Sequence, residues 1–257
     1  MEWELSIVLI LIVLGFMAAF IDAVVGGGGL ISTPALLAVG LPPAMALGTN
    51  KLASTFGALT GAFQFLRARK VDVRYTLKRF PFVFIAAALG AYMATLLPNA
   101  LLKPLIIFIL IAVLFYTLLK KDWGEVRQLR VLSPMHFICF SALLFMIGFY
   151  DGFLGAGTGS FMLFVFLMLG FDFLSAAGNA KVLNFASNLG ALVVFMYLGQ
   201  VNYLYGIVMA LSMIVGAAFG AQFAIRRGVH YVKWLFVIVT SSLILKSIYD
   251  IVLNFIK

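Results

Sequence analysis

The stretch from Gly15 to Asn50, GFMAAFIDAVVGGGGLISTPALLAVGLPPAMALGTN, decides the fold of this chain. It is apolar enough to enter a membrane, yet it holds one carboxylate, Asp22, and the four consecutive glycines of residues 26–29. Glycine is unfavourable in a helix interior because it loses more conformational freedom on folding than any other residue. The stretch therefore predicts a helix that is interrupted at membrane depth, directly after a charged side chain.

The composition of the whole chain points to a lipid environment. Of its 257 residues, 64% are hydrophobic and 11% are charged, and the mean hydropathy is +1.14. A soluble domain of this size cannot bury so much apolar surface. Because the apolar residues form near-continuous runs, we expect an all-α polytopic membrane protein and not a barrel of alternating strands. The first run, residues 5–25, follows an acidic flank and precedes no cleavage site, so we expect it to be retained.

Metal and disulfide chemistry are not indicated. Cys139 is the single cysteine of the chain. It stands three positions after His136, but no third ligand follows at helical spacing, and His230 has no second ligand at such spacing. We therefore predict no metal site and no cofactor. The net charge of +9 comes from basic residues between apolar runs, which is typical of topology determinants beside anionic lipid, so nucleic acid is not expected as a partner.

The chain contains an internal repeat. AFIDAVVGGGG, which includes Asp22, is echoed by GFYDGFLGAGTG, which includes Asp151. Beyond the glycines, matching residues stand 130 positions apart, as Lys51 and Lys181 do. The sequence predicts a first transmembrane repeat over residues 1–130 and a second over residues 131–257.

Each repeat holds the same set of apolar runs. The run at 28–40 has 13 residues, or about 20 Å of helix, and does not cross the ~30 Å hydrocarbon core. We therefore expect each repeat to consist of a glycine-broken hairpin plus three transmembrane helices. The runs are 5–25, 28–40, 42–66, 80–97 and 104–119 in the first repeat, and 134–154, 157–170, 173–198, 203–225 and 231–253 in the second.

The basic residues predict how the repeats face the membrane. Most of them lie in three segments, 67–79, 120–130 and 226–233, which we expect to be cytoplasmic. The counterpart of 67–79 is 197–209, which carries no charge. Equivalent loops therefore lie on opposite faces, which predicts two inverted-topology repeats and extracytoplasmic termini. Inverted repeats are typical of secondary transporters, which bind substrate near the midplane between them.

The glycine segments are candidate anion-binding elements. Irregular backbone survives at membrane depth only inside protein or beside a water-filled cavity. Each segment precedes a new helix, and a helix N-terminus offers free N–H donors and positive charge to an anion. The alternative is that the glycines only permit close helix packing. The candidate backbone and hydroxyl groups are those of Gly26, Gly27, Gly28, Gly29, Thr33, Gly155, Gly157 and Thr158.

When the charges of the loops and of the terminal regions are set aside, four charges remain inside the apolar runs: Asp22, Lys51, Asp151 and Lys181. A charge at this depth costs at least ~2.5 kcal/mol, so it normally faces a partner or a cavity. Two interpretations stay open, since the lysines either contact an anionic substrate or only neutralise the aspartates in structural ion pairs. The carboxylates would repel an anion, so we assign them to coupling, gating or pairing. Further candidate substrate contacts are Asn50, Asn179 and Asn184, with Asn188 continuing the face of Lys181 and Asn184.

The stretch FIDAVVGGGGLISTPALLAVGLPPAMALGTNKLAS closely resembles the sulfite exporter TauE/SafE family of bacterial membrane proteins, and GNAKVLNFASNLGAL is the looser second copy. The resemblance covers essentially the whole chain. It implies a transporter of small anions, often sulfur oxyanions or organosulfonates, in the bacterial cell (inner) membrane.

The sequence thus predicts a secondary transporter that moves a small anion by alternating access, with the anion held between half-helix N-termini and lysines. The alternative from another class is a membrane-embedded enzyme acting on a lipid or phosphorylated substrate. It is disfavoured because the chain has no G-x-S-x-G motif and no intramembrane histidine beside a serine. An assembly subunit would not explain the paired intramembrane charges. The sequence leaves open the substrate, the direction of transport, the coupling ion and whether the chain forms a homodimer.

Overall fold

The computed structural model describes residues 5–98 and 134–227, and every regular element in these two ranges is a helix. The predicted spans at 104–119 and 231–253, and the basic segment 120–130, lie outside the described residues. The helices are α1 (Leu5–Val25), α2 (Gly29–Ala38), α3 (Pro43–Arg67), α4 (Val73–Leu96), α6 (Pro134–Phe153), α7 (Thr158–Met168), α8 (Phe173–Tyr197) and α9 (Tyr203–Arg227).

Each half of the described chain has one short helix among long ones, at the place where the apolar runs predict it. Within the described part of the chain, four helices are long and apolar enough to cross a membrane: α1, α4, α8 and α9. The helices after the glycine segments are short, with 10 residues in α2 and 11 in α7. At 1.5 Å per residue neither reaches across the hydrocarbon core. The chain therefore folds as a multi-pass helical membrane protein in which two helices stop partway.

One boundary differs from the prediction. The sequence predicts a basic loop over residues 67–79 before the apolar run at 80–97, but α4 begins at Val73. Asp72 caps it, since its side chain accepts a hydrogen bond of 3.0 Å from the backbone N–H of Tyr75. The prediction was wrong because the first two turns of α4 carry basic residues, which lower the local hydropathy without breaking the helix.

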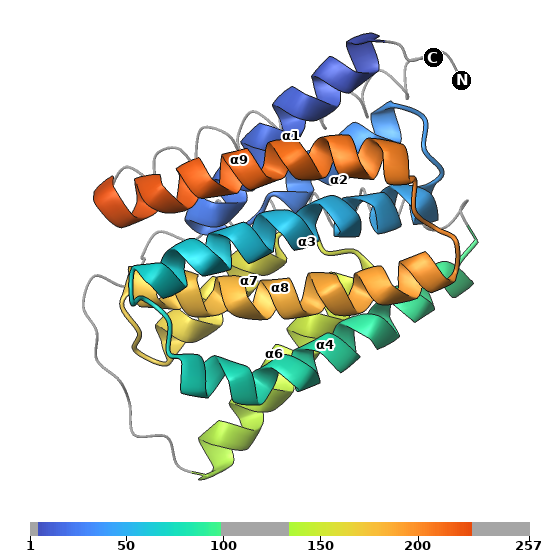
Figure 1. Cartoon of the computed structure of the whole chain (residues 1–257). Coiled ribbons are helices and arrows are strands. Elements are labelled where there is room, and N and C mark those ends of the chain that lie inside the picture. Colours follow the sequence, from blue (N-terminus) through green and yellow to red (C-terminus); the bar gives the residue numbers. More distant parts are fainter. Residues whose placement is uncertain (1–4, 99–133, 228–257) are drawn as a thin grey trace, which may run out of the picture.

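The two halves of the chain, residues 5–98 and 134–227 as described, pack closely against each other. α3 and α8 lie side by side at the centre and cross the molecule in opposite directions (Figure 1). On one side α1 packs on α9, and on the other α6 packs on α4, so each outer pair joins one helix from each half. α3 also packs on α9, and α8 also packs on α4. Any site between α3 and α8 is therefore built by both halves.

Matching contacts hold the ends of α3 and α8 together. The backbone N–H of Asn202 donates to the hydroxyl of Thr49 at 2.9 Å. The backbone N–H of Asp72 donates to the side-chain oxygen of Asn179, also at 2.9 Å. Thr49 and Asn179 stand 130 positions apart, as do Asp72 and Asn202. The N-terminal part of α3 is thus hydrogen-bonded to the loop after α8, and the N-terminal part of α8 to the loop after α3.

Candidate functional site

The two glycine segments interrupt the helices as predicted and lie against each other. α1 ends at Val25 and α2 begins at Gly29, while α6 ends at Phe153 and α7 begins at Thr158. Gly26 has φ +72°, a left-handed conformation that side chains disfavour, and a Cβ there would lie 2.2 Å from the carbonyl carbon of Gly159. Glycine at position 26 is therefore required both by backbone conformation and by close contact with the other half.

Ser160 provides a hydrogen-bond donor for the backbone carbonyl groups at the C-terminal end of α1. Its hydroxyl oxygen lies 3.0 Å from the carbonyl oxygen of Val25 and 2.7 Å from that of Gly26. Carbonyl groups at the end of a helix have no partner within that helix. A side chain from α7, in the other half, therefore supplies the donor that keeps this interruption stable inside the protein.

Asp22 and Lys181 form the first of two ion pairs that cross between the halves. Lys181 Nζ lies 2.6 Å from Asp22 Oδ2 and 2.6 Å from the backbone oxygen of the same residue. Asp22 Oδ1 accepts hydrogen bonds from the backbone N–H groups of Gly27 and Gly28, at 3.1 and 3.2 Å. The donors at this interruption, which the sequence suggested for a substrate anion, thus bind a carboxylate of the protein itself.

Lys51 and Asp151 form the second ion pair. Lys51 Nζ lies 2.8 Å from Asp151 Oδ1 and 3.1 Å from the side-chain oxygen of Asn188. Asp151 Oδ2 accepts from Asn184 Nδ2 at 3.3 Å and from the hydroxyl of Ser187. Both charged side chains are 2% exposed. Of the two interpretations of the lysines, ion pairing is therefore present in the structure, and each lysine pairs with the aspartate of the other half.

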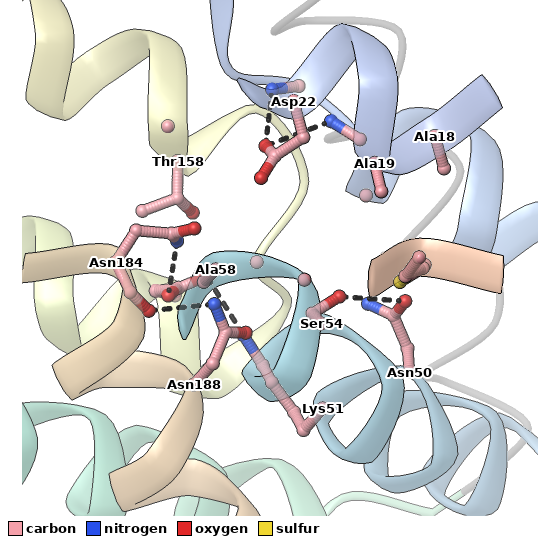
Figure 2. Close-up of a pocket in the computed structure, with 18 residues that line it drawn as sticks. Ala18, Ala19, Asp22, Asn50, Lys51, Ser54, Ala58, Thr158, Asn184 and Asn188 are labelled. Carbon is pink, nitrogen blue, oxygen red and sulfur yellow. Dashed lines mark hydrogen bonds and ion pairs between the residues drawn. The ribbon is translucent and has the colours of Figure 1, made fainter. Parts of the chain in front are cut away.

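A cavity lies between the two interruptions and the central helices. Figure 2 shows Lys51 and Asn188 directed toward one another, with Asn184 and Thr158 close by. The cavity has a volume of about 20 Å³, which is room for about one water molecule. It is lined by Ala18, Ala19, Asp22, Gly27, Gly28, Gly29, Asn50, Lys51, Ser54, Gly57, Ala58, Asp151, Gly155, Thr158, Gly159, Asn184, Asn188 and Met213.

Thr158 lines this cavity and has a buried hydroxyl. The residue is 1% exposed and begins α7. Its Oγ1 makes no hydrogen bond within the described part of the chain. A buried hydroxyl is normally paired, because leaving it unpaired costs free energy. Beside the N-terminus of α7, this hydroxyl is a donor available to an anion.

The predicted site residues divide into three groups. Most of them line the cavity, namely Asp22, Gly27, Gly28, Gly29, Asn50, Lys51, Asp151, Gly155, Thr158 and Asn184. Gly26 and Lys181 line a second, smaller cavity, which Asp22 and Gly159 also border. Thr33, Gly157 and Asn179 line neither cavity. Thr33 is buried, and its hydroxyl has no partner among the described residues.

Two polar residues of the site were not predicted. Ser54 lines the cavity and donates to the side-chain oxygen of Asn50 at 3.3 Å. Ser187 donates to Asp151. Helical spacing was the signal for both, since Ser54 follows Lys51 by three positions and Ser187 follows Asn184 by three.

Comparisons with known proteins find one family and several related sequences. Residues 11–247 match the model of the family described as "Sulfite exporter TauE/SafE". A "Probable membrane transporter protein" of Haemophilus influenzae is 40% identical over 252 residues, which cover 97% of this chain and 98% of the relative. "Probable membrane transporter protein ORF9" of Sinorhizobium sp. is 40% identical over 241 residues, 93% and 92% of the two chains. "Probable membrane transporter protein YfcA" of Escherichia coli K12 is 32% identical over 242 residues, 94% and 89%. No solved structure matches.

Proposed function

Because the chain belongs to the sulfite exporter TauE/SafE family, we propose that it carries a small anion, a sulfur oxyanion or an organosulfonate, across the bacterial plasma membrane by alternating access. Its relatives are probable membrane transporters, and this protein is likewise a membrane transporter and not an enzyme. The observation that carries the proposal is the polar cavity between the two interruptions, which is lined by a buried lysine and by a hydroxyl that has no partner among the described residues. Secondary transporters bind substrate in such a place, at broken helices near the midplane.

The anion binds to Lys51 and to the N-terminal end of α7. Lys51 supplies positive charge, and Thr158 supplies a free hydroxyl donor at a helix N-terminus. Asn184 adds a side-chain N–H on the same cavity wall. The cavity holds about one water molecule, so a sulfite ion enters only when side chains around it move. Substrate binding is therefore coupled to a change in this part of the protein.

The pair of Asp22 and Lys181 acts as a gate beside this site. Asp22 borders both cavities, whereas Lys51 lines only the larger and Lys181 only the smaller. Opening this ion pair would connect the two spaces. Gly26 and Gly28, beside this pair, allow a close approach of the backbone where a Cβ would collide.

We further propose that residues 1–130 and 131–257 are inverted repeats, with the basic segments 67–79 and 120–130 in the cytoplasm and both termini outside. The opposite directions of α3 and α8, the matching contacts of Thr49 and Asn179, and the two crossed ion pairs support this arrangement. Single cysteines at the equivalent exposed positions Arg67 and Tyr197, in a Cys139→Ser background, test it. An impermeant thiol reagent should label them from opposite sides of the membrane, and labelling from one side would refute the arrangement.

Transport by the purified full chain tests the function. Proteoliposomes should take up or release labelled sulfite, sulfoacetate or thiosulfate, and the Lys51→Ala/Lys181→Ala variant should lose this flux. Lys78→Ala, a change at an exposed lysine of α4, is the matched control. If the double variant moves the anion as fast as wild type, the lysine site is wrong. Turnover of a lipid phosphate without transport would favour the enzyme instead.

A further inference from the structure

We propose that Asp151 is a built-in substitute for the transported anion, and that it allows the protein to change orientation when no anion is bound. This inference rests on the proposed anion site at Lys51. It assigns to Asp151 a function in the return step of the transport cycle, separate from any part in holding helices together.

The surroundings of Asp151 are those of a bound anion. Its carboxylate accepts from Lys51 Nζ, Asn184 Nδ2 and the Ser187 hydroxyl. Lys51 comes from α3 in one half of the chain, while Asn184 and Ser187 come from α8 in the other. A carboxylate is itself an oxyanion, so these donors are suited to an external oxyanion as well. Asp151 therefore occupies the donors that a substrate would need.

Substrate and Asp151 compete for one ammonium group. The cavity beside the pair holds about one water molecule, so an anion of the size of sulfite reaches Lys51 only if the Asp151 carboxylate yields its place. In the empty protein Asp151 neutralises Lys51. In the loaded protein the substrate does, and the displaced carboxylate of Asp151 keeps Asn184 and Ser187 as hydrogen-bond donors. Lys51 thus has a counter-ion throughout the cycle, which its burial, at 2% exposure, requires.

Removal of the Asp151 charge should slow the return of the empty protein without slowing the crossing of the loaded protein. In Asp151→Asn the side chain keeps its shape, but Lys51 is left without a counter-ion unless an anion is bound. The empty protein then holds an unpaired buried charge and returns slowly, whereas the loaded protein is neutral and crosses normally. The variant should therefore exchange anions across the membrane but show little net transport.

Two assays on proteoliposomes of the full chain distinguish these steps. Net uptake of labelled sulfite into sulfite-free vesicles requires return of the empty protein, while exchange into vesicles loaded with unlabelled sulfite does not. We expect net uptake by Asp151→Asn to fall at least about tenfold while exchange stays within about threefold of wild type. Asp72→Asn is the control, since it makes the same change in an exposed loop and the second half has Asn202 at that position. It should leave both assays unchanged.

A purely structural function of Asp151 would lower both assays by the same factor, and that result would overturn the inference. Thermal unfolding in detergent gives a second test that does not depend on transport. Sulfite should raise the melting temperature of Asp151→Asn more than that of wild type, because the anion replaces the missing counter-ion. Equal shifts would also overturn it. If wild type moves none of sulfite, sulfoacetate and thiosulfate in either assay, the proposed function itself fails.

Discussion

The two ion pairs occupy equivalent places in the two halves of the chain, yet their surroundings differ. Lys51 and Asp151 are both 2% exposed, and Asn184, Ser187 and Asn188 complete their hydrogen bonds. In the other pair Lys181 is 5% exposed and Asp22 is 22% exposed. Asp22 is held by backbone amides of its own segment. Two ion pairs at equivalent positions therefore have different surroundings, and the two places are not equivalent as sites.

The difference arises on the facing helices. On α8 the positions next to the pair are Asn184, Ser187 and Asn188, whose counterparts on α3 are Ser54, Gly57 and Ala58. Gly57 and Ala58 have no side-chain donor for Asp22, so its carboxylate takes the N–H groups of Gly27 and Gly28 instead. The polar side chains of α8 thus make the pair of Lys51 the better candidate for substrate binding, and the pair of Lys181 the better candidate for a gate.

The largest effect should come from Lys51→Met. The change removes the ammonium proposed to bind the anion and leaves Asp151 as a buried carboxylate with only neutral partners. We expect transport of labelled sulfite in proteoliposomes to fall at least about a hundredfold, since breaking a buried pair costs several kcal/mol. Lys78→Met, at an exposed position of α4, should transport as wild type does. Retention of a third or more of wild-type flux by Lys51→Met would remove Lys51 from the site.

Lys181→Met should have a smaller effect. Asp22 is partly exposed and keeps the amides of Gly27 and Gly28 after the lysine is lost. We expect an approximately tenfold decrease in flux, with less loss of thermal stability than in Lys51→Met. Parallel flux and unfolding measurements on both variants would check this order. A greater loss of flux in Lys181→Met than in Lys51→Met would reverse the roles assigned to the two pairs.

Asn188→Ala makes α8 resemble α3 at the position of Ala58. It removes the 3.1 Å hydrogen bond from Lys51 to the Asn188 side chain but leaves the ion pair intact. Loss of one such bond should change the concentration of sulfite for half-maximal transport by about three- to tenfold. Val193→Ala, on the exposed face of the same helix, is the control. An unchanged concentration dependence would show that the polar face of α8 does not distinguish the two pairs.

Asp72→Asn should have the smallest effect. Asp72 caps α4 through the N–H of Tyr75, and Asn202 caps α9 through the N–H of Tyr205 in the same way. Asparagine is as good an N-cap as aspartate, so the free energy of unfolding should change by less than about 0.5 kcal/mol. Chemical or thermal unfolding in detergent measures the difference. A loss of more than about 2 kcal/mol would mean that the two capped loops are not equivalent.

Local features of the sequence predicted much of this arrangement. The interruptions at Gly26 and Gly155, the short helices after them and the four intramembrane charges all follow from composition and spacing. The start of α4 was missed because hydropathy does not detect a charged helix end with a good cap. Asn179 illustrates another limit, since it stands two positions from Lys181 and points away from the cavity face, as i and i+2 do on a helix.

The partners of the charges could not be deduced from the sequence alone. Ion pairs of Lys51 with Asp151, and of Lys181 with Asp22, join residues 100 and 159 positions apart. Helical spacing describes neighbours within one helix, whereas these contacts depend on how α3 meets the end of α6 and how α8 meets the end of α1. The sequence therefore predicted which residues are charged at membrane depth, and the packing determined which of them meet.

A density map of the protein, determined with and without an anion that it transports, tests the proposed site most directly. We predict new density in the cavity within hydrogen-bonding distance of Lys51 Nζ and the Thr158 hydroxyl, with the Asp151 carboxylate moved away from Lys51. Anion density at another place, with Lys51 and Asp151 still paired under conditions of transport, would contradict the site.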